Sequence, residues 1–466
     1  MVPDNSISLK EHSSIIRQLV RWAALVIPVA LVTGSIIAFF LWLLSAAIHF
    51  RFTHSWLLYL LPLAGLAIYL IYEFIGKSAE KGNNLIIEQI HTAGGGVPKR
   101  MTPVILLTTV ITHLFGGSAG REGTAVQIGA SIAAMFGNWY NLQGADLRMI
   151  LIAGVAAGFG AVFGTPLTGA IFAIEVLTIG RIQYDSLLPA LIASLVGDMT
   201  VAAWQVAHTH YQIDNFVPAP ALLSGMFHTD LLLLAKVILA SVAFGLASYL
   251  FAGLLHEIKN LVGKLLRQKW LVPVAGGLVI IGLTLVLGKP DYLSLGVDAQ
   301  YSGAVTIPSA FHAGGSTTWS WLWKIIYTSI TLGTGFKGGE VTPLFYIGAT
   351  LGNTLSVLLN APVSLFAALG FIAVFAGATN TPLACTFMGV ELFGGEHVLL
   401  YAVACFTAYI FSGHSGIYSA QQIAVPKISD ASFSAETSIA DAMKRRGYLH
   451  QKFNKYGFRA RKDRGA

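Results

Sequence analysis

Glu122 is an ionisable residue in a glycine-rich segment, Gly120-Arg121-Glu122-Gly123-Thr124, that lies between apolar runs of the chain. A carboxylate at membrane depth is costly and usually marks a functional site. An ionised carboxylate can occupy an anion site, whereas a protonated one is neutral and can move away. One side chain could therefore act as both gate and proton carrier. The alternative is a structural role for Glu122, as a helix cap or in a salt bridge with Arg121. Arg121 itself is expected to pair with a carboxylate elsewhere.

Glycine-rich backbone precedes an apolar stretch twice, at 116–120 and at 333–339. Irregular backbone is tolerated at membrane depth only where protein buries it or where it lines a cavity. A helix that begins there directs unpaired N–H groups and the positive end of its dipole into the cavity. Such a terminus binds anions without a fixed cation. The pattern predicts a pathway for a small anion, held weakly enough to be released.

Two motifs occur twice in the chain at nearly constant separations. The copies are Gly120-Arg121-Glu122-Gly123-Thr124 with Gly339-Glu340-Val341-Thr342-Pro343, and Gly164-Thr165-Pro166-Leu167 with Asn380-Thr381-Pro382-Leu383. The paired motifs begin 219 and 216 residues apart. In the second pair a glutamate, Glu175 or Glu391, follows the proline by nine residues, and we expect these two acids to serve helix packing rather than transport. Such repeats are typical of transporters whose broken helices meet at a substrate site near the membrane midplane.

The composition is that of a membrane protein. Of 466 residues, 55% are hydrophobic and 11% are charged, and the mean hydropathy is +0.68. A soluble domain usually carries about 25% charged residues. Stretches of about 20 apolar residues span a bilayer. Such stretches recur at 20–48, 56–75, 149–179, 231–255, 271–287, 321–359 and 363–411. We therefore predict an all-α polytopic membrane protein.

The formal net charge of +7 is concentrated at one end of the chain. Residues 427–466 contain ten Lys or Arg and four Asp or Glu, a net charge of +6. Basic flanks mark the cytoplasmic side of a span, so we expect a multi-pass protein of the cell inner membrane with both termini in the cytoplasm. The predicted divisions are a cytoplasmic segment 1–19, a transmembrane domain 20–424 and a basic cytoplasmic tail 425–466. For the tail, contact with anionic lipid is favoured over binding of nucleic acid.

The motifs resemble those of the CLC family of chloride channels and anion/proton antiporters. Family members carry a Gly-Arg-Glu-Gly-Pro segment whose glutamate is the external gate. The resemblance covers about 20–424 and includes Gly82-Asn83-Asn84, both Thr-Pro-Leu segments and Ile417-Tyr418-Ser419. It implies a CLC-type fold of two inverted repeats, about 20–210 and 225–424, with many tilted and broken transmembrane helices. It also implies a homodimer with one pore per subunit. The tail is too short for the paired CBS domains of larger relatives.

Four positions depart from the common family pattern. Asn83 replaces a central serine, Thr124 replaces the proline of the gate motif, Glu340 replaces an apolar residue, and Val176 replaces an inner proton-transfer glutamate. All four resemble the fluoride-exporting branch of the family. Fluoride is small and tightly hydrated, so replacing its water requires strong donors. An Asn amide offers two N–H donors where Ser offers one O–H.

The resemblance implies roles for the matching residues. Glu122 would be the gate and proton acceptor, and Glu340 and Thr342 would help to carry fluoride or protons. Asn83 and Tyr418 would face the central anion site. Further residues expected along the anion path are Gly120, Arg121, Gly123, the backbone N–H of Val341, and Tyr346 as one aromatic edge, the other aromatic position being Ile86.

We therefore expect a fluoride/proton antiporter that exports fluoride in exchange for inward protons. The alternatives within the family are a chloride/proton antiporter and a voltage-gated-type chloride channel, although a titratable gate argues against an open channel. An intramembrane enzyme with Glu122 and Glu340 as an acid pair would need a nucleophile or metal constellation, and the histidines have no ligand spacing. No enzyme activity, cofactor, metal or nucleic acid is expected.

Overall fold

The computed structural model describes residues 5–92, 96–214, 230–428 and 437–442, with side chains from residue 11. The predicted tail 425–466 lies mostly outside the described residues. The helices are α1 (Asn5–Thr53), α2 (Leu61–Ile71), α3 (Asn83–Thr92), α4 (Met101–Leu114), α5 (Glu122–Trp139), α6 (Gly144–Phe163), α7 (Pro166–Glu175), α8 (Leu187–Ala203), α9 (Leu231–Leu265), α10 (Leu271–Leu287), α11 (Ser320–Gly333), α12 (Val341–Leu359), α13 (Val363–Thr379), α14 (Pro382–Phe393) and α15 (Val398–Phe411). Single turns of 3-10 or π-helix lie at Ser55–Leu60, Tyr72–Gly76, Lys77–Ala79, Tyr184–Ser186, Ser309–Phe311 and Gly395–His397.

One small sheet accompanies the helices. Strand β2 (Gln422–Ile423) pairs in parallel with β1 (Thr178–Ile179) and antiparallel with β3 (Thr437–Ser438). The sheet joins the segment after α7 to the segments that follow α15. It therefore holds the part of the chain after the last helix against the first half.

Among the described residues, six helical stretches are long and apolar enough to cross a membrane, by length and composition. Shorter apolar helices accompany them. Helices α4 and α8 lie outside the predicted apolar stretches, so the chain contains more apolar helices than the sequence reading identified. The predicted all-α architecture is confirmed.

Two apolar runs are interrupted by a left-handed residue and a proline. Gly164 (φ +72°) separates α6 from α7, and Asn380 (φ +60°) separates α13 from α14. Pro166 and Pro382 open the helices that follow. Gly and Asn adopt this backbone conformation more readily than other residues, and Pro suits the first turn of a helix. The broken helices are thus encoded at matching positions of the two repeats.

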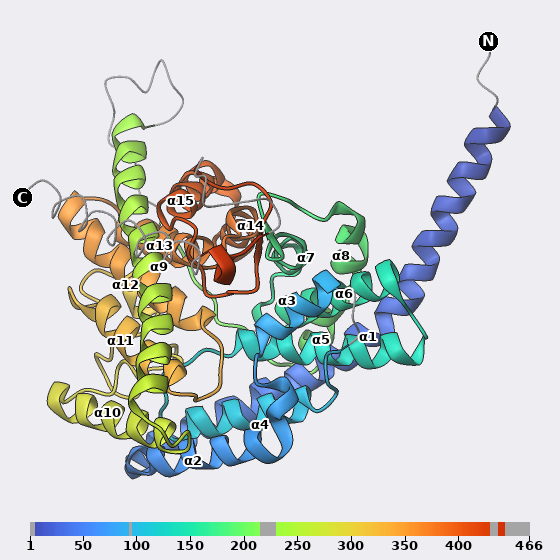
Figure 1. The fold of residues 1–466 in the computed structure, drawn as a ribbon. Coiled ribbons are helices and arrows are strands. Elements are labelled where there is room, and N and C mark those ends of the chain that lie inside the picture. Colours follow the sequence, from blue (N-terminus) through green and yellow to red (C-terminus); the bar gives the residue numbers. More distant parts are fainter. Residues whose placement is uncertain (1–4, 93–95, 215–229, 429–436, 443–466) are drawn as a thin grey trace, which may run out of the picture.

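The two halves use matching elements. Helices α4 to α8 correspond in order to α11 to α15. In each half the second and third of these, α5 with α6 and α12 with α13, pack closely together. Across the halves, α7 packs against α14 and α2 against α10, and Figure 1 shows α2 and α10 together at one end of the molecule.

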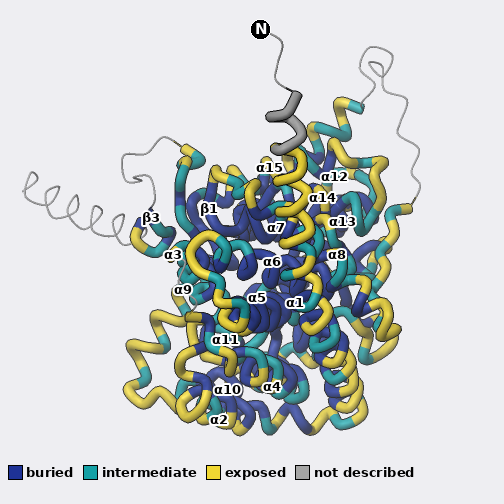
Figure 2. The backbone as a smooth tube through the Cα atoms, turned by 90° about the vertical axis from the view of Figure 1, so that its right-hand side faces the viewer, coloured by how far each residue is buried: buried dark blue, intermediate teal, exposed yellow. Residues whose placement is uncertain are grey.

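Glycine contacts repeat the same correspondence. A Cβ on Gly129 of α5 would lie 2.1 Å from the carbonyl oxygen of Gly154 on α6. A Cβ on Gly348 of α12 would lie 2.0 Å from the carbonyl oxygen of Gly370 on α13. Only glycine permits so close a backbone approach. Figure 2 shows α5 and α6 in the buried interior, whereas the first part of α1 is exposed.

Glu175, in the first half of the chain, caps a helix of the second half, and Glu391, in the second half, caps a helix of the first. The Glu175 carboxylate accepts from the N–H groups of Leu383 (3.0 Å) and Ala384 (2.8 Å), at the start of α14. The Glu391 carboxylate accepts from the N–H groups of Leu167 (2.9 Å) and Thr168 (2.8 Å), at the start of α7, and from the Thr168 hydroxyl (2.6 Å). Free N–H groups at helix starts require such acceptors. The packing role predicted for both acids is consistent with these contacts.

Glu391→Gln is expected to destabilise the protein. The amide NH₂ would face backbone N–H donors of α7, and each buried donor left without an acceptor costs about 1–3 kcal/mol. We expect a lower midpoint of thermal unfolding in detergent, with Glu396→Ala, on an exposed turn, as the control. Equal midpoints for Glu391→Gln and the unmodified protein would contradict the capping role.

Candidate functional site

Glu122 is the first residue of α5, and its carboxylate binds at the start of α12. The residue is 1% exposed. The Thr342 N–H donates to Oε2 over 3.0 Å, and the Thr342 hydroxyl lies 2.5 Å from Oε1 and 2.6 Å from Oε2. The Arg121 N–H also donates to Oε2, over 3.1 Å. The carboxylate therefore occupies a helix-start position that suits an anion.

This position exists because the two copies of the gate motif pair with each other. The N–H of Gly120 donates to the Gly339 carbonyl (2.6 Å), and the N–H of Gly339 donates to the Gly120 carbonyl (2.7 Å). The two segments are antiparallel, which brings the starts of α5 and α12 together from opposite halves of the chain. A Cβ on Gly339 would lie 2.6 Å from the backbone nitrogen of Gly123, so this approach requires glycine.

Asn83 and Glu340 approach each other at Gly123. A Cβ placed on Gly123 would lie 3.0 Å from Asn83 Nδ2 and 3.5 Å from Glu340 Oε2. Asn83 Oδ1 and Glu340 Oε2 are buried, and neither has a hydrogen-bond partner among the described residues. Buried polar atoms are nearly always paired, so the unpaired Glu340 Oε2 beside Gly123 and the unpaired Asn83 Oδ1 indicate a place for a ligand or a proton.

A small pocket adjoins Glu122. Arg121, Thr342 and His208 contribute to its polar wall. The aromatic part of the wall consists of Phe163, Tyr211, Phe345 and Phe371. Phe345 and Phe371 stack with centroids 3.8 Å apart. The sequence reading missed these aromatic residues and His208, because they come from separate elements and share no motif.

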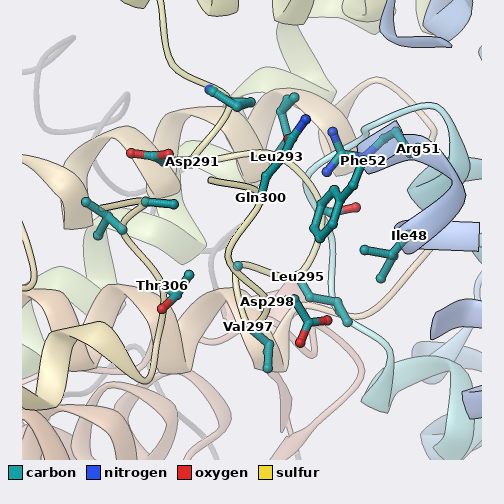
Figure 3. A pocket seen from close by; sticks show the side chains of 15 residues that line it. Ile48, Arg51, Phe52, Asp291, Leu293, Leu295, Val297, Asp298, Gln300 and Thr306 are labelled. Carbon is teal, nitrogen blue, oxygen red and sulfur yellow. The ribbon is translucent and has the colours of Figure 1, made fainter. Parts of the chain in front are cut away.

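A second small pocket, whose lining side chains are drawn in Figure 3, shares Val297 with the first. Arg51, at the end of α1, lines this pocket, with its guanidinium carbon 4.9 Å from the centre of the Phe52 ring. Arg51 is buried, and its Nε has no hydrogen-bond partner among the described residues. Asp291 and Asp298 line the same pocket, so its charge is mixed.

His113 connects the second pocket to the gate motif. The side chain is fully buried, with Nδ1 3.3 Å from the hydroxyl of Ser294 and Nε2 3.5 Å from the carbonyl oxygen of Gly120. Ser294 lines the second pocket. Buried polar contacts of His113 therefore join that pocket to the backbone of the gate segment. The sequence did not predict this role, because His113 belongs to no recognisable motif.

The ion pair that the structure shows for Arg121 is with the adjacent Glu122, whose Oε1 lies 3.6 Å from Arg121 Nε. No distant carboxylate partner, as was expected for Arg121, occurs among the described residues. Thr124, which departs from the family proline, places its hydroxyl 2.8 Å from that of Thr109 on α4. The Thr124 hydroxyl thus joins two helices rather than binding at Glu122.

Tyr418 and Val341 are two further residues predicted to lie along the anion path. Tyr418 is 4% exposed, and its segment is joined to the neighbour of Asn83 by a hydrogen bond from the Ala420 N–H to Asn84 Oδ1 (2.9 Å). Val341 begins α12, but the amide that binds the gate belongs to Thr342.

Tyr346 faces away from the Glu122 pocket. Its hydroxyl donates to the carbonyl of Val305 (3.3 Å), and its ring centre lies 5.1 Å from Lys324 Nζ. Tyr346 is not among the residues that line the pocket at Glu122, where Phe345 stands instead. Its predicted contact with the anion has no support in this arrangement.

Comparison with known proteins identifies the family. Residues 63–413, most of the chain, match the family described as the voltage gated chloride channel. The chain belongs to this family, the CLC family. A chloride/fluoride channel protein from Pseudomonas syringae pv. tomato is 47% identical to it over 414 residues, 89% of each chain. An H(+)/Cl(-) exchange transporter from Vibrio cholerae is 26% identical over 379 residues, 77% of this chain and 76% of that protein.

Solved CLC structures share the fold. The crystal structure of a CLC-type fluoride/proton antiporter is 32% identical and has a TM-score of 0.80, covering 87% of this chain and 98% of that one. A slow cyanobacterial Cl-/H+ antiporter, at 20% identity and a TM-score of 0.68, shows the same fold over 84% of this chain and 94% of its own. The chain is therefore a multi-pass membrane protein with the CLC-type fold.

Proposed function

We propose that this protein is a fluoride/proton antiporter that exports fluoride in exchange for inward protons. The observation that carries the proposal is the Glu122 carboxylate, held by the N–H and hydroxyl of Thr342 at the start of α12. The names of two relatives support the choice of ion, since one is a chloride/fluoride channel protein and the other a CLC-type fluoride/proton antiporter.

Exchange follows from competition for the same donors. An ionised Glu122 and an anion both require the donors at the start of α12, so the anion binds there only when the carboxylate leaves. Protonation removes the negative charge and weakens the charge-assisted hydrogen bonds from Thr342 and Arg121. Each departure of Glu122 is thereby linked to proton uptake. An open channel would need no titratable group in this position.

Asn83 and Glu340 supply donors of the kind that fluoride requires. The Asn83 amide lies beside Gly123, and a protonated Glu340 can donate a hydrogen bond from an oxygen that is otherwise unpaired. A small anion loses much hydration energy on leaving water, so strong donors favour fluoride over chloride. The proposal also assigns Tyr418, Gly120 and Gly123 to the anion path.

The same proposal includes the setting of the protein. It places the chain in the cell inner membrane as a homodimer with one pore per subunit and both termini in the cytoplasm. Residues 1–19 and 425–466 form the cytoplasmic ends, and 20–424 the two inverted repeats. The basic tail and the basic residues of the first segment support this orientation. The family consists of transporters and channels, and we assign the protein transport rather than catalysis.

Ion efflux from proteoliposomes tests the proposal. Purified protein in liposomes loaded with fluoride should release fluoride while protons enter, as followed by a fluoride electrode and a pH electrode. Liposomes loaded with chloride should release it more slowly. Chloride release at an equal rate would refute fluoride selectivity, and fluoride release without proton entry would refute exchange.

A further inference from the structure

Lys427 follows strand β2, and its side-chain nitrogen lies among four oxygen atoms. Nζ donates to Asn380 Oδ1 (2.5 Å), to the carbonyls of Tyr409 (2.6 Å) and Gly413 (2.6 Å), and lies 3.1 Å from the Ser412 hydroxyl. Three of these acceptors belong to the end of α15. A lysine that caps a helix end is common and by itself implies stability alone.

Through Asn380, Lys427 is also linked to a segment outside α15. Asn380 is the left-handed residue that ends α13, and it is 2% exposed. Its Nδ2 donates to Gln421 Oε1 (2.9 Å) and approaches the carbonyl of Ser415 (3.3 Å). Ser415 and Gln421 stand on either side of Tyr418 in the chain. The amide thus joins Lys427 to both ends of the Tyr418 segment, residues 415–421.

Lys427 also determines the direction of this hydrogen-bond chain. Because Nζ donates to Asn380 Oδ1, the Asn380 oxygen is turned toward Lys427 and the amide NH₂ toward Gln421. Gln421 must then accept with Oε1 and donate with Nε2. Its Nε2 donates to the carbonyls of Val176 (2.8 Å) and Thr379 (3.0 Å).

Other bonds of the Tyr418 segment lead to the predicted anion site. The N–H of Ile417 donates to the carbonyl of Ala378 (2.9 Å). The N–H of Ala420 donates to Asn84 Oδ1 (2.9 Å), and Asn84 is the neighbour of Asn83 at the start of α3. The segment is therefore held between the end of α13 and the start of α3, and Lys427 contacts it through Asn380 at the end of α13.

We propose that Lys427 is a positioning residue of the transport cycle, which fixes the Tyr418 segment through Asn380 and Gln421. This inference rests on the proposed function, because it assigns Tyr418 to the anion path. Without the ammonium group, the Asn380 amide can turn over, and the Gln421 amide loses its fixed partner. Tyr418 then takes up more than one position relative to Glu340 and Glu122.

The number of protons exchanged per anion tests the inference. Lys427→Met keeps the length of the side chain and removes its donors, whereas Asn380→Gly keeps the left-handed backbone and removes the amide. Each variant should change the proton-to-anion ratio, because each removes one link between Lys427 and the Tyr418 segment. The double variant should change it no more than the larger single change, because both act on one chain of contacts.

Lys236→Met is the matched control. Lys236 on α9 donates to the carbonyl of Asn360 (2.8 Å), the left-handed residue that ends α12, and has no contact with the Tyr418 segment. It should leave the proton-to-anion ratio unchanged. A loss of stability alone would lower anion and proton fluxes together, so an unchanged ratio in Lys427→Met and Asn380→Gly would overturn the inference. If Lys427→Met does not fold, Asn380→Gly decides.

The same liposomes separate this inference from the proposed function. If the unmodified protein exchanges an anion for protons, the variants are measured with that anion, and their ratio alone decides the role of Lys427. If the unmodified protein moves no anion, or moves it without protons, the proposed function fails and the role of Lys427 in exchange fails with it.

Discussion

Glu122→Gln abolishes proton-coupled fluoride transport, with an expected loss of about 100-fold or more, as for removal of a positioned acid or base. Glutamine keeps the size of the side chain and an oxygen that accepts from Thr342, but it cannot ionise or carry a proton. Fluoride and proton fluxes from proteoliposomes measure the effect. If Glu122→Gln transports fluoride coupled to protons at the rate of the unmodified protein, Glu122 is not the gate.

His208→Gln is the control for this substitution, because His208 lines the same pocket. Burial and the nearby charge of Arg121 lower the pKa of His208 to about 4. The imidazole is therefore already neutral between about pH 5 and pH 8, well above that pKa. We expect the dependence of transport on pH in this range to be the same in His208→Gln as in the unmodified protein.

Gly339→Ala should remove transport by separating the two gate segments. The new Cβ would lie 2.6 Å from the backbone nitrogen of Gly123 and 3.2 Å from that of Glu122. Both neighbours are backbone atoms, and they cannot move without breaking the backbone hydrogen bonds between Gly120 and Gly339. Forcing an extra methyl group into such a contact costs about 1–3 kcal/mol. Fluoride efflux and the midpoint of thermal unfolding should both fall.

Gly253→Ala provides the matched control for Gly339→Ala. Gly253 lies within α9, and a Cβ there would have no neighbour within 4 Å. Alanine is favoured over glycine inside a helix by about 0.5–1 kcal/mol, so this change should preserve or raise stability and leave efflux unchanged. Normal efflux from Gly339→Ala would show that the pairing of the two segments is dispensable.

The sequence predicted the repeats and the gate because both depend on local motifs. Matching offsets identified Gly120–Thr124 with Gly339–Pro343. The sequence reading treated 149–179 and 363–411 as continuous apolar stretches, whereas the left-handed residues Gly164 and Asn380 break them. What the motifs did not reveal is that Gly120 and Gly339 bond directly to each other. That contact depends on how the two halves dock, which no single segment determines.

Contacts within the site depend on the same docking. The Thr342 N–H binds Glu122, because the orientation of the first turn of α12 decides which N–H faces the carboxylate. Tyr346 lies one turn further along α12 but packs against Lys324 instead. The aromatic wall takes Tyr211 from a loop and Phe371 from α13, so only the folded chain brings its members together.

Transport driven by a proton gradient tests the central claim most directly. Proteoliposomes would hold equal fluoride inside and outside, with an acidic exterior and the membrane potential clamped at zero by potassium and valinomycin. Antiport predicts that protons entering down their gradient drive fluoride out, so that external fluoride rises above its starting value. A constant external fluoride concentration, with protein that is folded and correctly inserted, would contradict exchange of fluoride for protons.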